Sequence, residues 1–97
     1  MTVIRHAVFR GRVQGVGFRA HVEGVAARTV VGGWVRNRRD GTVEAVFAGD
    51  AKAVKDSIAA CRKGSYAARV DGVEIRDGRE AELALRGNDT FAVLPTV

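Results

Sequence analysis

The chain has 97 residues, which is enough for one domain with a single hydrophobic core and too short for a second. Hydrophobic residues make up 46% and charged residues 28%, so disorder is not expected, and the net charge of +5 favours anionic partners. No apolar run approaches the ~18 residues of a membrane span, and the charged N-terminus does not resemble a signal peptide. We therefore expect a cytoplasmic protein without a membrane partner.

The first third of the chain predicts a strand, a glycine-rich turn and a helix. Residues 3–13 favour a strand in which Ala7 and Phe9 share one face. The turn Gln14–Gly17 ends this strand, and a helix is expected over residues 18–30. The apolar stripe of that helix consists of Phe18, Val22, Val25 and Ala26.

A β-hairpin is expected next. Gly32-Gly33 should stop the helix, and strands 34–38 and 42–48 should follow, joined at Asp40-Gly41. The register at this turn is open. A two-residue turn pairs Asn37 with Glu44, whereas a three-residue turn with a glycine bulge pairs it with Val43.

The second register pairs Asn37 with Val43 and gives the more coherent apolar face. It places Asn37 on the helix-covered side of the sheet, where a buried amide needs partners that the edge of a site would supply. The alternative is a polar residue near a fraying hairpin tip. In this register the outer face carries Trp34, Arg36, Arg38 and Glu44.

The second half of the chain predicts a helix over residues 51–62, with Asp50 as its N-cap and Gly64 at its end. Cys61 falls on the apolar stripe of this helix, so we interpret it as a core thiol. As the single cysteine, it excludes an internal disulfide and a cysteine metal cluster.

Two more strands are expected at residues 67–75 and 90–94, while residues 77–89 are compatible with a strand, one helical turn or a loop. The resulting order, β-α-β-β-α-β with an extra C-terminal strand, is the α+β ferredoxin-like sandwich. This plan has an antiparallel sheet with both helices on one face. The fold hosts many functions and does not define one.

The string GVGFRA (Gly15–Ala20) matches the G-x-G-x-x-G/A pattern of dinucleotide sites, and Asp40 follows about 20 residues later, where an acidic ribose ligand is expected. That ligand must end a second parallel strand, however, whereas Asp40 lies in a hairpin turn. A doubly wound domain also needs several βαβ units, for which this chain is too short. We therefore exclude a dinucleotide site.

The same loop is suited to a single phosphoryl group. Gly15 and Gly17 can take positive φ and leave the backbone accessible, so successive N–H groups can form an anion-binding nest. The following helix N-terminus also favours negative charge. Arg19 is unfavourable for the helix dipole there, which suggests a bidentate clamp on phosphate. The alternative is a solvated charge beside a simple turn.

The strings GRVQGVGFR (Gly11–Arg19) and GWVRNRRDGTVEAVFAGD (Gly33–Asp50), in this order and with a helix-length gap, resemble the acylphosphatase family. The resemblance covers residues 1–97 as one acylphosphatase-like domain, although Gly64-Ser65 stands where the family usually has Gly-Pro. It implies that Arg19 binds the phosphate and that Asn37 positions the attacking water. The phosphate-binding set that it implies is Gln14, Gly15, Val16, Gly17, Phe18 and Arg19.

The expected reaction is metal-independent hydrolysis of an acyl phosphate to a carboxylate and inorganic phosphate, by a monomer without a cofactor. The leaving carboxylate has a conjugate acid of pKa about 4, so no general acid is needed. His6 and His21 are far apart in the pattern and offer no metal-ligand set, and His21 is expected on the helix surface.

RNA binding on the open sheet face is the alternative function. It would stack bases on sheet aromatics, and Trp34, flanked by Arg36 and Arg38, is the one ring expected to point outward. One aromatic ring offers little surface for base stacking, so we expect no nucleic-acid partner. A further possibility is a module of a larger hydrogenase-maturation protein, which the short chain does not favour.

Overall fold

The computed structural model describes residues 1–97 and contains five strands in one sheet. The sheet has the order β4-β1-β3-β2-β5, in which β5 runs parallel to β2 and the other neighbours are antiparallel. The ferredoxin-like order is thus confirmed, but the sheet is mixed rather than wholly antiparallel. The elements are β1 (Thr2–Arg12), α1 (Phe18–Thr29), β2 (Gly32–Asn37), β3 (Val43–Asp50), α2 (Ala51–Lys63), β4 (Arg69–Asp77), α3 (Glu80–Leu83), the 3₁₀ turn η1 (Ala84–Arg86) and β5 (Phe91–Val93).

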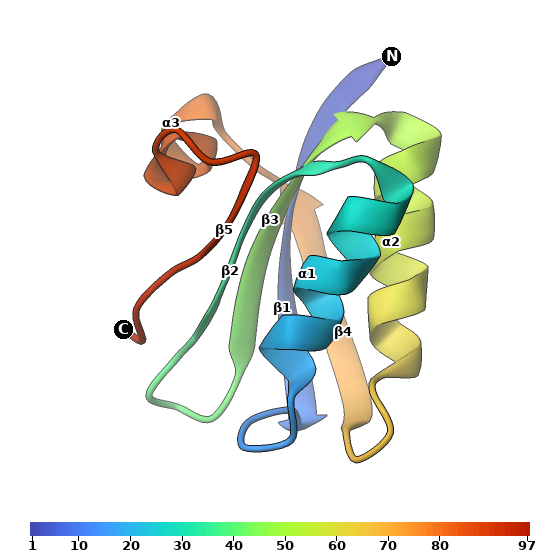
Figure 1. The fold of residues 1–97 in the computed structure, drawn as a ribbon, viewed down its shortest axis with the longest axis vertical. Coiled ribbons are helices and arrows are strands. Elements are labelled where there is room, and N and C mark those ends of the chain that lie inside the picture. Colours follow the sequence, from blue (N-terminus) through green and yellow to red (C-terminus); the bar gives the residue numbers. More distant parts are fainter.

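Helices α1 and α2 lie side by side on one face of the sheet (Figure 1). The main core fills the space between them and the sheet, and it contains the expected stripe of α1. Strand alternation places Ala7 and Phe9 of β1 in this core, as expected, together with Val35 of β2 and Phe47 of β3. Phe9 and Phe18 meet edge to face, with ring centroids 5.3 Å apart.

The two long helices end in different ways. Asp50 caps α2 by accepting the Lys52 N–H, and Gly64 follows the last helical residue, as expected. Helix α1 instead ends at Thr29, and Val30 takes the left-handed conformation (φ 57°) while its N–H donates to the carbonyl of Ala26. The expectation that Gly32-Gly33 stops the helix is wrong, because both glycines already belong to β2.

A second, smaller apolar cluster lies on the opposite face of the sheet, under α3. Trp34 is 1% exposed there, and its Nε1–H donates to the carbonyl oxygen of Glu82 at 2.7 Å. Trp34 lies on the outer sheet face, as the register predicts, but the expectation of an exposed ring is wrong, because part of the ambiguous segment 77–89 folds as a helical turn that covers it. The cluster consists of Trp34, Val46, Leu83 and Ala92.

Cys61 is buried in the main core, which confirms its interpretation as a core thiol. Burial raises the pKa of this thiol to about 12, so it stays protonated at neutral pH. Among the helices of the structure, none combines the length and the apolar character that crossing a membrane requires.

Candidate functional site

The β2–β3 hairpin has the three-residue turn with a glycine bulge. Asn37 pairs with Val43, which confirms the second of the two registers. The turn closes with a hydrogen bond from the Gly41 N–H to the Arg38 carbonyl (3.1 Å), and Gly41 has φ 92°. The Arg38 N–H then donates to the carbonyl of Thr42 at 2.9 Å.

Asp40 fixes the shape of this turn. Its Oδ1 accepts the side-chain hydroxyl of Thr42 at 2.6 Å and the backbone N–H of the same residue at 3.0 Å. These two hydrogen bonds hold the pKa of Asp40 below its ordinary value, with a smaller contribution from the positive charge of Arg38. The carboxylate is therefore part of the turn and is not aimed at a ligand.

The β1–α1 loop (Gln14–Gly17) lies beside this hairpin turn at one end of the sheet (Figure 1). Gly15 and Gly17 both have left-handed backbone angles (φ 72° and 76°), and a Cβ added at either would meet no atom within 4 Å. Gly17 is the N-cap of α1, so no side chain caps the helix, and its first turn holds no acidic residue. No side chain therefore caps the first-turn N–H groups of α1, and no carboxylate of that turn competes for them.

Gln14 connects the loop to the hairpin. Its Nε2 donates to the carbonyl oxygens of Arg38 (2.7 Å) and Thr42 (2.8 Å). Both side-chain N–H groups are thus used to hold the two motifs together, a role that the sequence pattern did not reveal. On the other side of the loop, the Ser65 hydroxyl donates to the carbonyl of Val16 at 3.3 Å.

Asn37 is half-buried at the end of β2, on the helix-covered face together with Val35. Its Oδ1 atom is buried and accepts no hydrogen bond from any protein group, the one side-chain atom of the structure in that condition. Buried carbonyl oxygens normally have a partner, so this atom is a candidate acceptor for a water or a polar ligand atom. The neighbouring Arg38 carbonyl is one of the acceptors of Gln14.

Arg19 lies half-buried in the first turn of α1, immediately after the loop and Phe18. It takes part in none of the nine ion pairs of the structure. Arg36, in contrast, donates to Glu44 at 2.8 Å and lies 4.6 Å from the ring centre of Trp34. Of the three hairpin arginines, Arg36 is therefore paired, whereas Arg38 and Arg39 enter none of these ion pairs.

The two histidines lie in separate environments. His6 is buried on the opposite sheet face, and its Nε2 lies 2.6 Å from Oε2 of Glu44. His21, expected on the helix surface, is half-buried and packs 6.0 Å from the ring of Phe18. No group of three or more His, Cys, Asp or Glu side chains in the structure could hold a metal ion.

The fold and the site together define a ferredoxin-like α+β domain with a glycine-rich loop at a helix N-terminus and an adjacent polar hairpin. The family model for acylphosphatase matches residues 5–91. An acylphosphatase of Nitrobacter hamburgensis is 56% identical over 96 residues, which cover 98% of this chain and 97% of that protein. One of Rhodopseudomonas palustris (strain BisB18) is 50% identical over 97 residues, with coverage of 99% and 98%.

The crystal structure of acylphosphatase from Bacillus subtilis superposes with a TM-score of 0.83 at 33% identity, covering 97% of this chain and 99% of that one. The chain therefore belongs to the acylphosphatase family. It is an acylphosphatase, a hydrolase whose substrate is an acyl phosphate. The alternative of RNA binding required an exposed Trp34 ring on the sheet, and this ring is buried under α3.

Proposed function

We propose that this chain hydrolyses acyl phosphates by in-line attack of one water on phosphorus, without a metal ion and without a phosphoenzyme. The observation that best supports this proposal is the buried, unpartnered Oδ1 of Asn37. It lies on the hairpin that Gln14 holds against the β1–α1 loop. The proposed water-orienting group and the proposed anion-binding loop thus belong to segments that Gln14 joins.

The phosphoryl group would be bound by the β1–α1 loop and the first turn of α1. Backbone N–H groups of residues 15–19 would donate to its non-bridging oxygens, and the open space at Gly15 and Gly17 allows close approach to the backbone. The Arg19 guanidinium would add two charge-assisted hydrogen bonds. Phosphoryl transfer depends mainly on such positioning and charge stabilisation.

The attacking water would be held by Asn37. Its Oδ1 can accept a hydrogen bond from the water and so fix the direction of the attacking lone pair. An amide is not a base at neutral pH, so we propose that a phosphate oxygen of the substrate takes the proton. The P–O bond to the acyl group breaks as the new P–O bond forms, and the products are a carboxylate and dihydrogen or monohydrogen phosphate.

The leaving group needs no help from the protein. A carboxylate whose conjugate acid has a pKa of about 4 departs at neutral pH without a proton. This agrees with a β1–α1 loop without a carboxylate and a hairpin turn (residues 38–42) whose one carboxylate, Asp40, is bound within the turn.

The test is turnover of benzoyl phosphate by Asn37→Ala, with Asn88→Ala as the matched control, since Asn88 is exposed and lies outside the site. Loss of a group that stabilises the transition state typically lowers the rate about 10²–10³-fold. We expect a loss of this size for Asn37→Ala, none for Asn88→Ala, and unchanged wild-type turnover in excess chelator. Full activity of Asn37→Ala would refute the role of that residue, and loss of activity with chelator would refute the metal-independent reaction.

A further inference from the structure

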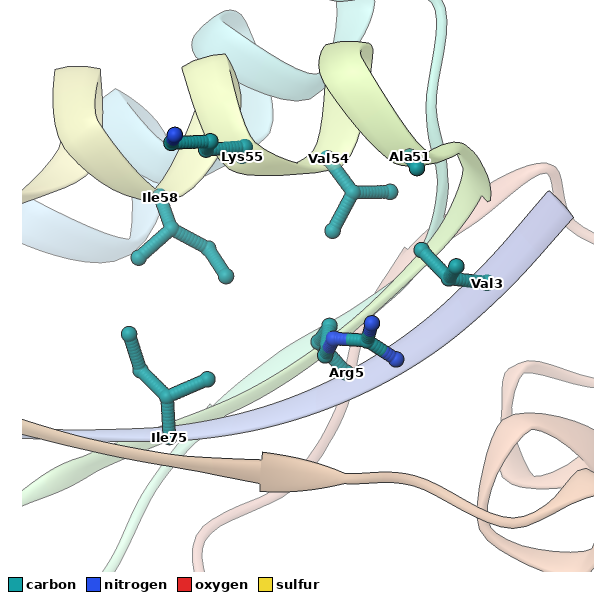
Figure 2. A pocket seen from close by; sticks show the side chains of 7 residues that line it. All are labelled: Val3, Arg5, Ala51, Val54, Lys55, Ile58 and Ile75. Carbon is teal, nitrogen blue, oxygen red and sulfur yellow. The ribbon is translucent and has the colours of Figure 1, made fainter. Parts of the chain in front are cut away.

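A cavity of about 320 Å³ lies between α2 and the sheet edge formed by β1 and β4, as Figure 2 shows. Its size is at the lower end of the range for small-molecule sites. The site is remote from the β1–α1 loop: about seven residue steps of β1 separate Arg5 from Arg12, the last strand residue before the loop, a span of roughly 23 Å at ~3.3 Å per residue. Its lining consists of Val3, Arg5, Ala51, Val54, Lys55, Ile58 and Ile75.

Arg5 breaks the apolar pattern of its strand. It has the same parity as Ala7 and Phe9, so its side chain starts on the helix-covered face, next to the main core. A charged residue at such a position contradicts the local pattern, and departures of this kind are typical of functional sites. The Arg5 side chain is 34% exposed and reaches one acidic group, Asp77, at 2.9 Å.

The charges around the cavity are cationic. Lys55 of α2 enters no ion pair of the structure. Asp77, the partner of Arg5, has an 88% exposed side chain outside the cavity, and no carboxylate is among the lining residues. An anion entering the cavity would therefore meet the unpaired Lys55 and the guanidinium of Arg5, which Asp77 pairs from outside the lining, and no carboxylate among the lining residues.

The walls of the cavity are aliphatic. Ile58 of α2 and Ile75 of β4 face each other across it, and Val54 points toward Arg5 (Figure 2). Ile75 is 53% exposed, so the cavity opens to solvent at the β4 edge. Branched aliphatic walls without an aromatic ring favour a flexible hydrocarbon chain over a planar ring.

We propose that this cavity binds the carboxylate form of a short aliphatic acid, with the carboxylate on the Arg5 guanidinium, the positive charge of Lys55 adding attraction from α2, and the hydrocarbon chain between Ile58 and Ile75. Acyl phosphate hydrolysis itself releases carboxylates, so the ligand belongs to the same chemical class as one product of the enzyme. The binding site, however, is separate from the loop where that reaction is proposed to occur. The proposal stands whether or not Arg19 and Asn37 have the roles given above.

The experiment is a titration of the isotopically labelled protein with hexanoate, followed by amide NMR shifts. We expect saturable shifts at Arg5 and in residues 54–58, with a Kd in the millimolar range or below. Hexanol and hexylammonium carry the same chain without the negative charge, and loss of the charge-assisted contacts should weaken their binding about tenfold. Lys55→Gln should weaken hexanoate binding about fivefold, a smaller effect because the lysine is exposed.

Lys52→Gln is the matched control, because Lys52 is on the same helix but is paired with Asp56 at 2.8 Å and does not line the cavity. It should bind hexanoate like the wild type. Three results would each overturn the proposal: no saturable shift at the cavity, equal affinity for hexanol and hexanoate, or shifts confined to residues 14–19. The last would show binding at the catalytic loop instead.

Discussion

The side-chain amide of Gln14 lies 2.8 Å from the backbone carbonyl oxygen of Thr42, and this hydrogen bond joins the β1–α1 loop to the β2–β3 hairpin. The same nitrogen also donates to the carbonyl of Arg38, the residue that follows Asn37. Through these contacts the position of the loop is set relative to the Asn37 amide. Catalysis by positioning is sensitive to shifts of about 1 Å, so this connection should affect the rate as well as the stability.

Gln14→Ala removes both donors, so we expect it to lower kcat by about tenfold or more, because the loop and Asn37 lose their fixed relative position. The two carbonyls keep their hairpin hydrogen bonds from Gly41 and Arg38, which limits the loss in free energy of unfolding to about 1–2 kcal/mol. Steady-state kinetics and urea unfolding measure the two effects. Ser65→Ala, which removes the weaker contact on the other side of the loop, is the comparison. Wild-type kcat in Gln14→Ala would contradict a positioning role.

Arg19 and Asn37 should differ in their effect on product inhibition. Arg19→Ala removes a proposed phosphate ligand, so competitive inhibition by inorganic phosphate should weaken about tenfold or more. Asn37→Ala removes a proposed water ligand and should leave that inhibition nearly unchanged while turnover falls. The inhibition constant of inorganic phosphate, measured with benzoyl phosphate as the substrate, tests this difference between the two variants. Equal weakening by both substitutions would mean that Asn37 also binds the phosphoryl group.

Trp34 should be important for stability and not for nucleic-acid binding. Trp34→Ala empties a fully buried site and should lower the free energy of unfolding by about 3–5 kcal/mol. Trp34→Phe keeps most of the apolar contact but loses the Nε1–H donor to Glu82, for which we expect about 1–2 kcal/mol. Urea unfolding followed by circular dichroism is the appropriate measurement, since the substitutions remove the single tryptophan. A cost below about 1 kcal/mol for Trp34→Ala would contradict its burial.

Glu82 should make the free energy of unfolding depend on pH in the acid range. Hydrogen bonds from Arg76, aided by the Arg79 N–H, outweigh burial and lower the pKa of Glu82 from 4.5 to about 2. Because the folded-state pKa is below the unfolded value, ionised Glu82 stabilises the fold above pH 4.5, and this contribution is lost as the pH falls toward 2. Glu82→Gln should therefore be less stable than the wild type at neutral pH, with the difference closing on acidification.

Urea unfolding at a series of pH values measures this difference, with the exposed Glu23→Gln as the control for the loss of one carboxylate. Burial of Glu44 raises its pKa, but hydrogen bonds from His6 and Arg36 outweigh that effect and the pKa is lowered overall. Glu44 is present in wild type and variant alike, so its acid sensitivity cancels in the comparison. A constant difference across the acid range would show that the Arg76–Glu82 pair does not have the assigned effect.

Much of the central architecture could be predicted from local signals. Strand parity placed Phe9 in the core, and the N-cap at Asp50 and the stop at Gly64 set the limits of α2. The hairpin register remained open because both turn lengths suit Asp40-Gly41. The structure resolves it through the Thr42 hydroxyl, which binds the Asp40 carboxylate and stabilises the longer turn.

The burial of Trp34 could not be predicted, because it depends on a segment 48 residues further along the chain. Helix α3 has only four residues, too few for a periodic pattern, and it is held by the Arg76–Glu82 pair and by burial of Leu83. The hydrogen bonds from Gln14 to the hairpin could not be predicted either. A glutamine next to a glycine-rich turn does not indicate whether its side chain faces a ligand or a neighbouring hairpin.

The pairing of β1 with β3 has a consequence for how the enzyme gains activity as it folds. Phe9 pairs with Val43, so the end of β1 that leads to Arg19 lies beside the start of the strand that follows Asn37. The two proposed catalytic residues come together only when this non-local pair of strands has formed. Pairings of this kind carry a large loop-closure entropy and form slowly. During refolding, hydrolysis of acyl phosphates should therefore return with the central sheet, and a chain with its helices alone should have no activity.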